Sequence, residues 1–434
     1  MSMPLQEKWP RGPKNELHFA ADMGSTQRTA AILSSGLIDV NQGDPNGWTP
    51  LMVASQRGYT RIVRILLKEG ANVLIVADHG FTALLTCAQY GNLAVCKMLV
   101  KAGAHLEAAT STNGSRPLHM AADKGHAAVI TALIDAGANL DSRRFDRATP
   151  LYMACERGHV EAVRAFLRAK ADPLLVRLNA SRDRFIPLDA AAGKGRSLVV
   201  RELLGQLGID GCGGPSRGAH ALYHAAKEQF VDAMAVLADA GVVDPGIALI
   251  GAIKENREGS IKFLLRQQLL QGKPTGAYVD GARDHFGRTS LLCSIEDEGD
   301  KWCFPRIARM LIDAGADTTS AVRVFKLGIV PVEETPLELM NRYLGEDNVV
   351  RRDITEEQAH KLDAVHRLLL RVEAVHAASW LWVSDAPDIA HTAEGTSRTK
   401  GTPSTRREML PVLGLSTTRR NAFLPAVLRY SSKS

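Results

Sequence analysis

Three residues within the stretch RPLHMAADKGH (residues 116–126) have side chains that could hold a metal ion. His119, Asp123 and His126 follow one another at intervals of four and three, which on a single helix would place them on one face. Two imidazoles and a carboxylate on one face form a ligand set that catalytic metal sites use. Whether these residues do chemistry depends on the elements that position them.

The surrounding sequence repeats itself. Four segments align without a gap: 49–72, 82–105, 116–139 and 149–172. Their leading leucines lie 33, 34 and 33 residues apart: Leu51, Leu84, Leu118 and Leu151. Further copies, some of them looser, begin at Leu17, Leu188, Leu222, Leu249, Leu291 and Leu337. A period near 33 residues is typical of a helix-turn-helix solenoid, here of about ten units.

The recurring words, TPLHxAAxxGH followed by VVxxLLxxGADxN, resemble the ankyrin repeat. The resemblance covers residues 15 to about 320, with weaker agreement to about 375. It implies an all-α fold, an ankyrin-type solenoid with a short hairpin finger in the loop between units. It also implies that partner proteins bind on a concave side, which the fingertips and the exposed ends of the first helices form.

The residue types in each slot fit helices that stop and start at fixed places. Thr149 can cap a first helix while Pro150 occupies its first turn, where a missing N–H costs nothing. A first helix must stop in the left-handed conformation that glycine accepts, and glycine stands there in five units: Gly58, Gly91, Gly125, Gly158 and Gly195. Gly70, Gly103 and Gly137 then end second helices. Lys170 replaces glycine in its unit, which predicts an ill-formed cap or a different turn.

Departures from the repeat predict how the chain is divided. We expect an N-terminal arm, a regular array, irregular repeats, a degenerate terminal repeat or cap, and a basic Ser/Thr-rich disordered tail: 1–14, 15–207, 208–320, 321–383 and 384–434. The glycine-rich stretch 208–218 is predicted to be a flexible loop. Between Leu222 and Leu249 there is no room for a finger, so the array should be irregular there. The tail either folds back weakly or carries a docking motif.

Charge and cysteine usage limit the function classes. The net charge is +6, of which the tail from Ser384 onward carries +4, so the body lacks the basic surface of a nucleic-acid binder. Only the tail offers a weak attraction to an acidic or membrane surface. No apolar run suggests a signal peptide or a membrane span, and the six cysteines are too scattered for a disulfide framework. We therefore expect a reducing compartment, the cytoplasm or alternatively the nucleus.

Alignment removes the metal hypothesis. The slot of His119 is filled in other units by unrelated side chains: His18, Met52, Leu85, Tyr152, Asp189 and Tyr223. Gly125 should end the first helix, so His126 starts the second helix and points elsewhere. His119 is predicted to be a neutral histidine that bonds to nearby backbone, as the histidine of TPLH does in ankyrin repeats. No phosphate-loop, dinucleotide or catalytic motif is present, so no enzyme activity, cofactor or small-molecule substrate is expected.

Candidate binding residues follow from the resemblance, slot by slot. The finger positions hold Asn46, Trp48, His79, Phe81, Asn113, Phe145, Arg147, His285 and Arg288. The helix-end positions hold Gln56, Arg57, Gln89, Tyr90, Asp123, Lys124, Glu156, Arg157 and Lys194. Aromatic and arginine side chains are enriched at interface hot spots. Trp48, Phe81 and Tyr90 would form one aromatic patch, unless Trp48 and Phe81 brace neighbouring fingers.

Together these observations predict a non-catalytic scaffold or adaptor that binds one or more unidentified proteins. Two alternatives stay open. One is the regulatory subunit of an enzyme, with its chemistry in the irregular region 208–380. The other is a tether to a membrane surface or a nucleic acid through the basic tail.

Overall fold

A computed structural model describes residues 16–178, 184–272, 274–285, 287–295, 304–319, 322–324, 332–338 and 356–384. The helices up to Asp313 belong to one compact unit, and the last helix, α22 (Glu356–Ser384), belongs to a second. The predicted N-terminal arm and tail lie outside the described residues, apart from the last residue of α22.

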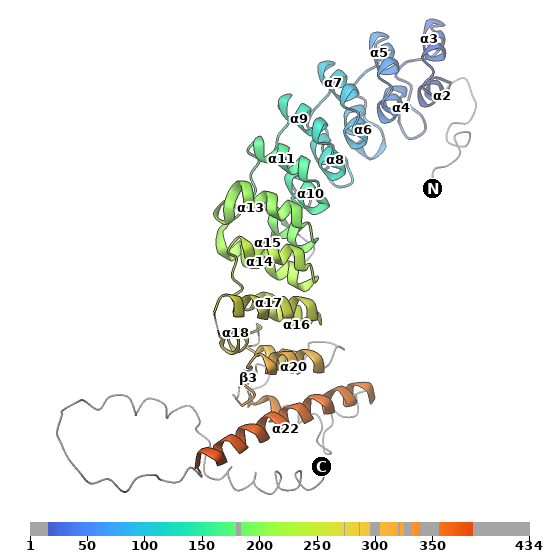
Figure 1. The fold of residues 1–434 in the computed structure, drawn as a ribbon. Coiled ribbons are helices and arrows are strands. Elements are labelled where there is room, and N and C mark those ends of the chain that lie inside the picture. The colour runs from blue at the N-terminus through green and yellow to red at the C-terminus, as the bar shows by residue number, and fades with distance from the viewer. Residues whose placement is uncertain are drawn as a thin grey trace, which may run out of the picture. The chain divides into compact units, whose positions relative to one another are not determined.

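The helices of the first compact unit come in pairs that stack one after another (Figure 1). The first helices pack against each other in one row: α2 (Glu16–Asp22), α4 (Pro50–Arg57), α6 (Ala83–Tyr90), α8 (Pro117–Lys124), α10 (Pro150–Arg157), α12 (Pro187–Gly193), α14 (Gly214–Lys227), α16 (Ile247–Lys254) and α19 (Ser290–Ile295). Their partners are α3 (Thr26–Ser34), α5 (Thr60–Lys68), α7 (Leu93–Lys101), α9 (Ala127–Asp135), α11 (Val160–Arg168), α13 (Ser197–Gly211), α15 (Val231–Asp239), α17 (Glu258–Leu270) and α20 (Pro305–Asp313). The predicted all-α solenoid is confirmed.

The remaining elements are short. They are η2 (Asp78–Gly80), α18 (Thr275–Gly281), β1 (Arg177–Leu178), β2 (Arg184–Phe185), β3 (Val322–Val324) and β4 (Val332–Glu334). β1 pairs with β2 in antiparallel register, Arg177 opposite Phe185, and β3 pairs with β4.

Capping follows the sequence pattern. The N–H of Tyr152 donates to Thr149 Oγ1 at 3.2 Å, as predicted, and Thr49 and Thr82 cap their helices in the same way. Arg116 stands where threonine is absent, and there the N–H of Arg116 donates to His119 Nδ1 at 3.4 Å. This bond satisfies the N–H of Arg116, and not the N–H of His119 from which a threonine hydroxyl would accept.

The stop glycines are required for two reasons. Gly91 has a φ of 77°, the left-handed conformation that a side chain resists. The imidazole of the next unit's His126 also lies on it: a Cβ on Gly91 would stand 2.5 Å from His126 Nδ1. Glycine therefore both ends the helix and admits the neighbouring unit.

The core runs along the stack between the two helix rows. The leading leucines are at most 1% exposed, and the second helices bury Leu66, Leu99, Leu133 and Phe166 completely. Their chain neighbours are only half-buried: Leu67, Val100, Ile134 and Leu167. One residue further along a helix is turned by about 100°, away from the adjacent unit.

The prediction of a flexible loop at 208–218 is wrong. Helix α13 continues through a kink at Gly208 to Gly211, and α14 begins at Gly214. Gly218 is buried so closely that a Cβ there would lie 2.8 Å from side-chain carbons of Ile209 and Val242. These glycines permit close packing of helices rather than a loose connection.

The irregularity predicted between Leu222 and Leu249 is confirmed. In the finger before α10, the N–H of Arg144 donates to the carbonyl of Ala148 at 3.0 Å, closing a hairpin. The short connection before α16 has no such hairpin. There buried Asp244 accepts the N–H groups of Gly246, Ala248 and Leu249 at 2.9, 3.0 and 3.0 Å.

In α22, Leu362, Val365 and Leu369 are fully buried. Most of the unit that begins at Leu337 lies outside the described residues until α22 begins.

The six cysteines were expected to be reduced, but Cys87 of α6 and Cys96 of α7 form a disulfide. Both are buried. Their separation of nine residues gave no signal, because only the turn after Gly91 brings the two helices of this unit together. Cys155, Cys212 and Cys293 are free and buried.

The turn expected to differ at Lys170 does not differ. Lys170 has a φ of 64°, in the left-handed region that Gly137 adopts at the same slot. The N–H groups of Lys170 and Ala171 donate to Leu167 and Phe166 at 3.0 and 3.1 Å, as those of Gly137 and Ala138 donate in their unit. The surrounding unit therefore imposes the conformation on a lysine.

We predict that Lys170→Gly stabilises the protein by about 1 kcal/mol, because a lysine pays a steric cost in left-handed backbone that glycine avoids. Gly137→Lys is the matched control: it creates the same conflict and should destabilise by about the same amount. Urea unfolding followed by circular dichroism measures both. A Lys170→Gly variant no more stable than the parent would contradict the prediction.

We predict that digestion without reductant yields the Cys87 and Cys96 peptides cross-linked. Reduction should lower the free energy of unfolding by about 2–3 kcal/mol, because the unfolded chain loses a closed loop. Peptide mass spectrometry and thermal unfolding measure the two effects. A Cys87→Ala/Cys96→Ala variant should not respond to reductant, and separately alkylated peptides from the parent would refute the pairing.

Candidate binding surface

Backbone hydrogen bonds join the fingers of successive units. The N–H of Asp78 donates to Asn46 O at 3.0 Å, and that of Ser111 donates to His79 O at 2.9 Å. The same bond recurs from Phe145 to Asn113 O and from Leu178 to Asp146 O, each at 3.0 Å. We call these four contacts the finger ladder. These bonds fix the backbone of each fingertip to the next one. The side chains on the tips are therefore attached to ordered backbone.

Trp48 and Phe81 meet between two adjacent fingers. Their ring centroids are 6.0 Å apart and the rings are inclined by 28°, a stacked arrangement. Both side chains are half-buried. This geometry supports the interpretation that they brace the fingers. Tyr90 is engaged elsewhere: its hydroxyl accepts a hydrogen bond from Gln56 Nε2 at 2.7 Å.

The helix-end residues form charged contacts between units. Arg57 Nε donates to Asp22 Oδ1 at 2.8 Å, and three units further on Arg157 Nε donates to Asp123 Oδ1 at 2.7 Å. Lys124 also approaches Asp123, at 3.1 Å. Burial pushes the pKa of Asp123 upward, but the hydrogen bonds from Lys124 and Arg157 outweigh it and hold the pKa below its usual value.

A further cluster lies next to Glu156. Arg177 of β1 contacts Glu156 at 3.3 Å and Asp146 at 3.0 Å, and its guanidinium lies over the ring of Tyr152. Sequence alignment missed Arg177, because it belongs to the β1–β2 hairpin, which is longer than the other fingers. In the sequence, the position of Arg177 in a finger slot was the one feature that could have indicated its place next to Glu156.

Exposure separates the predicted residues into groups. Exposed members are Asn46, Arg57, His79, Tyr90, Lys124, Phe145, Arg147, Arg157, Lys194 and His285. Half-buried members are Trp48, Gln56, Phe81, Gln89, Asn113, Asp123 and Glu156. Phe145 is 71% exposed and Tyr90 is 49% exposed, which is unusual for large aromatic side chains.

Arg288 was expected at the surface, and this expectation is wrong. It is 4% exposed, and its Nε and terminal nitrogens lie 2.9 and 2.7 Å from Asp284 Oδ2. The side chain of Asp284 is also buried, at 1% exposed. Burial raises the pKa of Asp284, but the bonds from Arg288 more than compensate and lower it. A charged pair in a finger was taken as solvated because the sequence gives no sign of its burial.

His119 fulfils its structural prediction. Its Nε2 lies 3.1 Å from the carbonyl of Ala148 in the next unit, and burial lowers the pKa of its imidazole to about 4. The left-handed turn at Gly125 separates it from His126, whose Nε2 instead contacts Gln89 O at 3.1 Å. Among the described residues, no group of three or more His, Cys, Asp or Glu side chains is arranged to hold a metal.

Within the described ranges, none of the helices combines the length and the apolar character needed to cross a membrane.

We predict that His119 makes the protein acid-sensitive. Its folded pKa, about 4, lies below the unfolded value of 6.5, so the unfolded state binds the extra proton between these pH values. Stability should therefore fall as the pH drops from 6.5 to 4, by up to ~3 kcal/mol from this residue. Unfolding free energies at several pH values measure this. In the His119→Gln variant, the loss of unfolding free energy between pH 6.5 and pH 4 should be smaller by this amount. An equal loss in variant and parent would contradict the prediction.

Comparisons with known proteins agree with this architecture. The sequence profile for ankyrin repeats, in three copies, matches residues 17–110, 74–144 and 118–212. The human transient receptor potential cation channel subfamily A member 1 is 41% identical over 69 residues, 15% of this chain and 6% of that protein.

Two other relatives share similarly short segments. The NAD-capped RNA hydrolase NUDT12 of Macaca fascicularis is 37% identical over 70 residues, 15% of each chain. The human ankyrin repeat and SAM domain-containing protein 3 is 38% identical over 58 residues, 13% of this chain and 9% of that protein.

The chain thus spans at most 15% of the length of these relatives. Their names share no single activity. Ankyrin repeats form a protein–protein interaction module. Residues 17–212 of the chain are therefore ankyrin repeats.

Proposed function

We propose that the chain is a non-catalytic scaffold or adaptor that holds a partner protein on its finger face. The finger face consists of the fingertips and the adjacent ends of the first helices, between residues 46 and 157. The family supports protein binding in general, and the residues of this chain support a particular surface for it.

The observation that carries the proposal is the combination of exposed side chains with the finger ladder. Phe145 is 71% exposed, although the N–H of the same residue is bonded to Asn113 O at 3.0 Å in the ladder. A large aromatic side chain is thus presented to solvent on backbone that is already fixed. Binding to such a surface loses little conformational entropy.

The contacts divide the proposed residues into binders and supports. Phe145, Tyr90, His79, Asn46 and Arg147 are exposed and available to a partner. Trp48 and Phe81 stack on each other, so they are proposed to hold two neighbouring fingers together rather than to contact the partner.

The charged residues at the helix ends have a double role. Arg57 and Arg157 are exposed, yet each forms an ion pair with a carboxylate of the preceding unit. Lys124 approaches the same carboxylate as Arg157. Arg57 pairs with an Asp22 side chain that is only 1% exposed, so it is held in place. Arg157 and Lys124 share Asp123 nearer the surface, where ion pairs contribute little to stability, so these two cations can turn to an acidic group on a partner at small cost. They would guide association and set specificity rather than supply most of the affinity.

We predict that a Phe145→Ala/Tyr90→Ala variant captures the partner at least tenfold less well, because aromatic anchors dominate interface energetics. Its unfolding midpoint should change little, since Phe145 is 71% exposed and Tyr90 is 49% exposed and loses one surface hydrogen bond, to Gln56. Quantitative affinity capture from the native cell, with circular dichroism beside it, measures the two effects.

Leu198→Ala is the matched control. Leu198 is 63% exposed on α13, a second helix away from the fingers, so its removal should leave capture unchanged. A double variant that retains everything the parent captures would show that the finger face is not the binding surface.

A further inference from the structure

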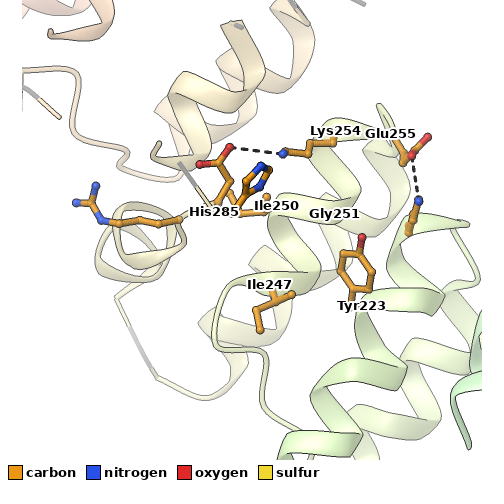
Figure 2. A pocket seen from close by; sticks show the side chains of 10 residues that line it. Tyr223, Ile247, Ile250, Gly251, Lys254, Glu255 and His285 are labelled. Carbon is orange, nitrogen blue, oxygen red and sulfur yellow. Dashed lines mark ion pairs between the residues drawn. The ribbon is translucent and has the colours of Figure 1, made fainter. Parts of the chain in front are cut away.

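Lysines and arginines of the array commonly have a carboxylate partner, also where they line a pocket. A pocket of about 490 Å³ lies against helices α14 and α16 (Figure 2). There Lys254 Nζ lies 3.5 Å from Asp284 Oδ2, and Lys227 Nζ lies 3.4 Å from Glu255 Oε1, as the dashed lines show. Cations that have such partners within the chain have less charge to offer to another molecule.

Two second helices show the same pairing at one position. The fifth residue of α11 is Arg164, which lies 2.6 Å from Glu161 Oε1 and 2.8 Å from Glu202 Oε2. The fifth residue of α17 is Lys262, which lies 3.6 Å from Glu258 Oε2. In these units the basic side chain has an acidic partner on its own helix or on the next second helix.

Helices α5 and α7 depart from this pairing. Their fifth residues are Arg64 and Lys97, and Arg61, Lys68 and Lys101 lie on the same two helices. We call these five exposed residues the basic patch. Neither helix contains Asp or Glu, and none of the five forms an ion pair or a side-chain hydrogen bond with another described residue. Their charges are therefore available to a partner.

The basic patch is regular because its two units align without a gap. Arg64 and Lys68 lie one helical turn apart on α5, and so do Lys97 and Lys101 on α7. Helices α5 and α7 pack side by side (Figure 1), so equivalent residues are neighbours. The four cations thus lie at the corners of a quadrilateral with sides of about 6 Å and about 10 Å. Arg61 extends the α5 row by one turn.

Two carboxylates lie at the margin of the basic patch. Glu69 follows Lys68 in the chain, and Asp135 of α9 lines the same cavity as Lys97 and Lys101. Neither carboxylate forms an ion pair with a described residue. Five positive charges against two negative charges leave an excess of three on this surface. The net charge summed over the whole chain does not reveal this local excess.

The cavity gives the basic patch an apolar neighbour. It has a volume of about 210 Å³ and lies between α7 and α9, where Val100, Ala132 and Leu133 supply apolar lining. Val100 and Ala132 are only half-buried, so part of this lining is in contact with solvent. Pockets for drug-sized ligands have about 300–1,000 Å³, so this smaller cavity suits one apolar side chain.

We propose that the basic patch and the cavity beside it bind an acidic helix of a partner protein. Carboxylates one turn apart on that helix would meet Arg64 and Lys68 or Lys97 and Lys101, and one apolar side chain would enter the cavity. The proposal rests on the chain being a protein-binding scaffold. It adds a second partner surface, in the row of second helices rather than on the finger face.

The described side chains favour this occupant over a nucleic acid or a membrane. Single-stranded nucleic acids stack their bases on aromatic rings, and α5 and α7 contain none. Attachment to a membrane surface combines cations with apolar side chains that enter the lipid, and no large apolar side chain of α5 or α7 is among the exposed ones. An acidic helix uses both features that are present, the regular cations and the small apolar cavity.

The test is a selection from a random peptide library displayed on phage, with the full-length chain immobilised. The enriched peptides should include ones that combine Asp or Glu, three or four residues apart, with an aliphatic or aromatic residue. Each is labelled, and fluorescence anisotropy gives its dissociation constant for parent and variants. Arg64→Glu/Lys97→Glu should weaken binding about tenfold or more, because it reverses two charges that meet the carboxylates.

Ala132→Leu tests the cavity separately. The larger side chain fills space beside Val100 and Leu133 without changing the charge, so the acidic peptides should lose about tenfold in affinity. The fold should be kept, because Ala132 is half-buried and alanine and leucine are both strong helix formers. Circular dichroism checks this. Unchanged affinity in this variant would overturn the assignment of the cavity.

Arg201→Glu/Arg266→Glu is the matched control for charge. Both arginines are exposed on second helices away from the basic patch, α13 and α17. The double substitution changes the net charge by the same amount as Arg64→Glu/Lys97→Glu. It should leave peptide affinity unchanged, which separates a loss specific to the patch from a general change of charge.

Three results would overturn the proposal. They are a selection that enriches no acidic peptide, acidic peptides that bind Arg64→Glu/Lys97→Glu as tightly as the parent, and an equal loss of affinity in the charge control. A short DNA duplex or phosphatidylserine vesicles that bind the parent more tightly than the peptides do would assign the patch to a nucleic acid or a membrane instead. If the patch test fails while Phe145→Ala/Tyr90→Ala still lowers partner capture, the proposed function stands without this inference.

Discussion

The structure depends on the packing of each unit against the stop glycine of the unit before it. The imidazole of His126 lies on Gly91 and bonds to Gln89 O at 3.1 Å, and His159 makes the same contact one unit later, with Gly125 and Asp123 O. No unit could bury its apolar helix faces alone. The left-handed glycine that ends the first helix of one unit is therefore also the residue against which the next unit packs. Ion pairs such as Arg157–Asp123 and the finger ladder add to this contact at the edges of the stack.

This coupling supports the proposal that the finger face is a binding surface. Its residues are held by bonds that run from unit to unit, so several fingertips present their side chains in one fixed arrangement. Much of the polar chemistry on this face is internal: Gln56 is bonded to Tyr90, and Glu156 to Arg177. The exposed aromatic side chains are what distinguishes the surface.

The helix-turn-helix units, their caps and their stop glycines could be predicted from sequence because each depends on residues a few positions apart. Thr149 and Gly125 show this. The stacking of Trp48 on Phe81 and the burial of Arg288 could not, since both depend on how side chains pack in space. Lys170 adopts the turn of a glycine because its unit imposes it. The segment 208–218 forms helix because Gly218 packs against Ile209 and Val242, which local glycine content does not reveal.

The buried carboxylate of Asp244 has a mechanical consequence. The finger ladder ties units together up to Leu178, but at the junction of α15 and α16 the connection relies on one side chain, which binds three backbone N–H groups and the hydroxyl of Tyr278 at 2.6 Å. The helices on either side are joined by bonds of their own, from Arg257 Nε to Lys227 O at 2.9 Å and from Ser260 Oγ to Ala226 O at 2.8 Å. Loss of the Asp244 carboxylate would therefore loosen the connection without separating the two units.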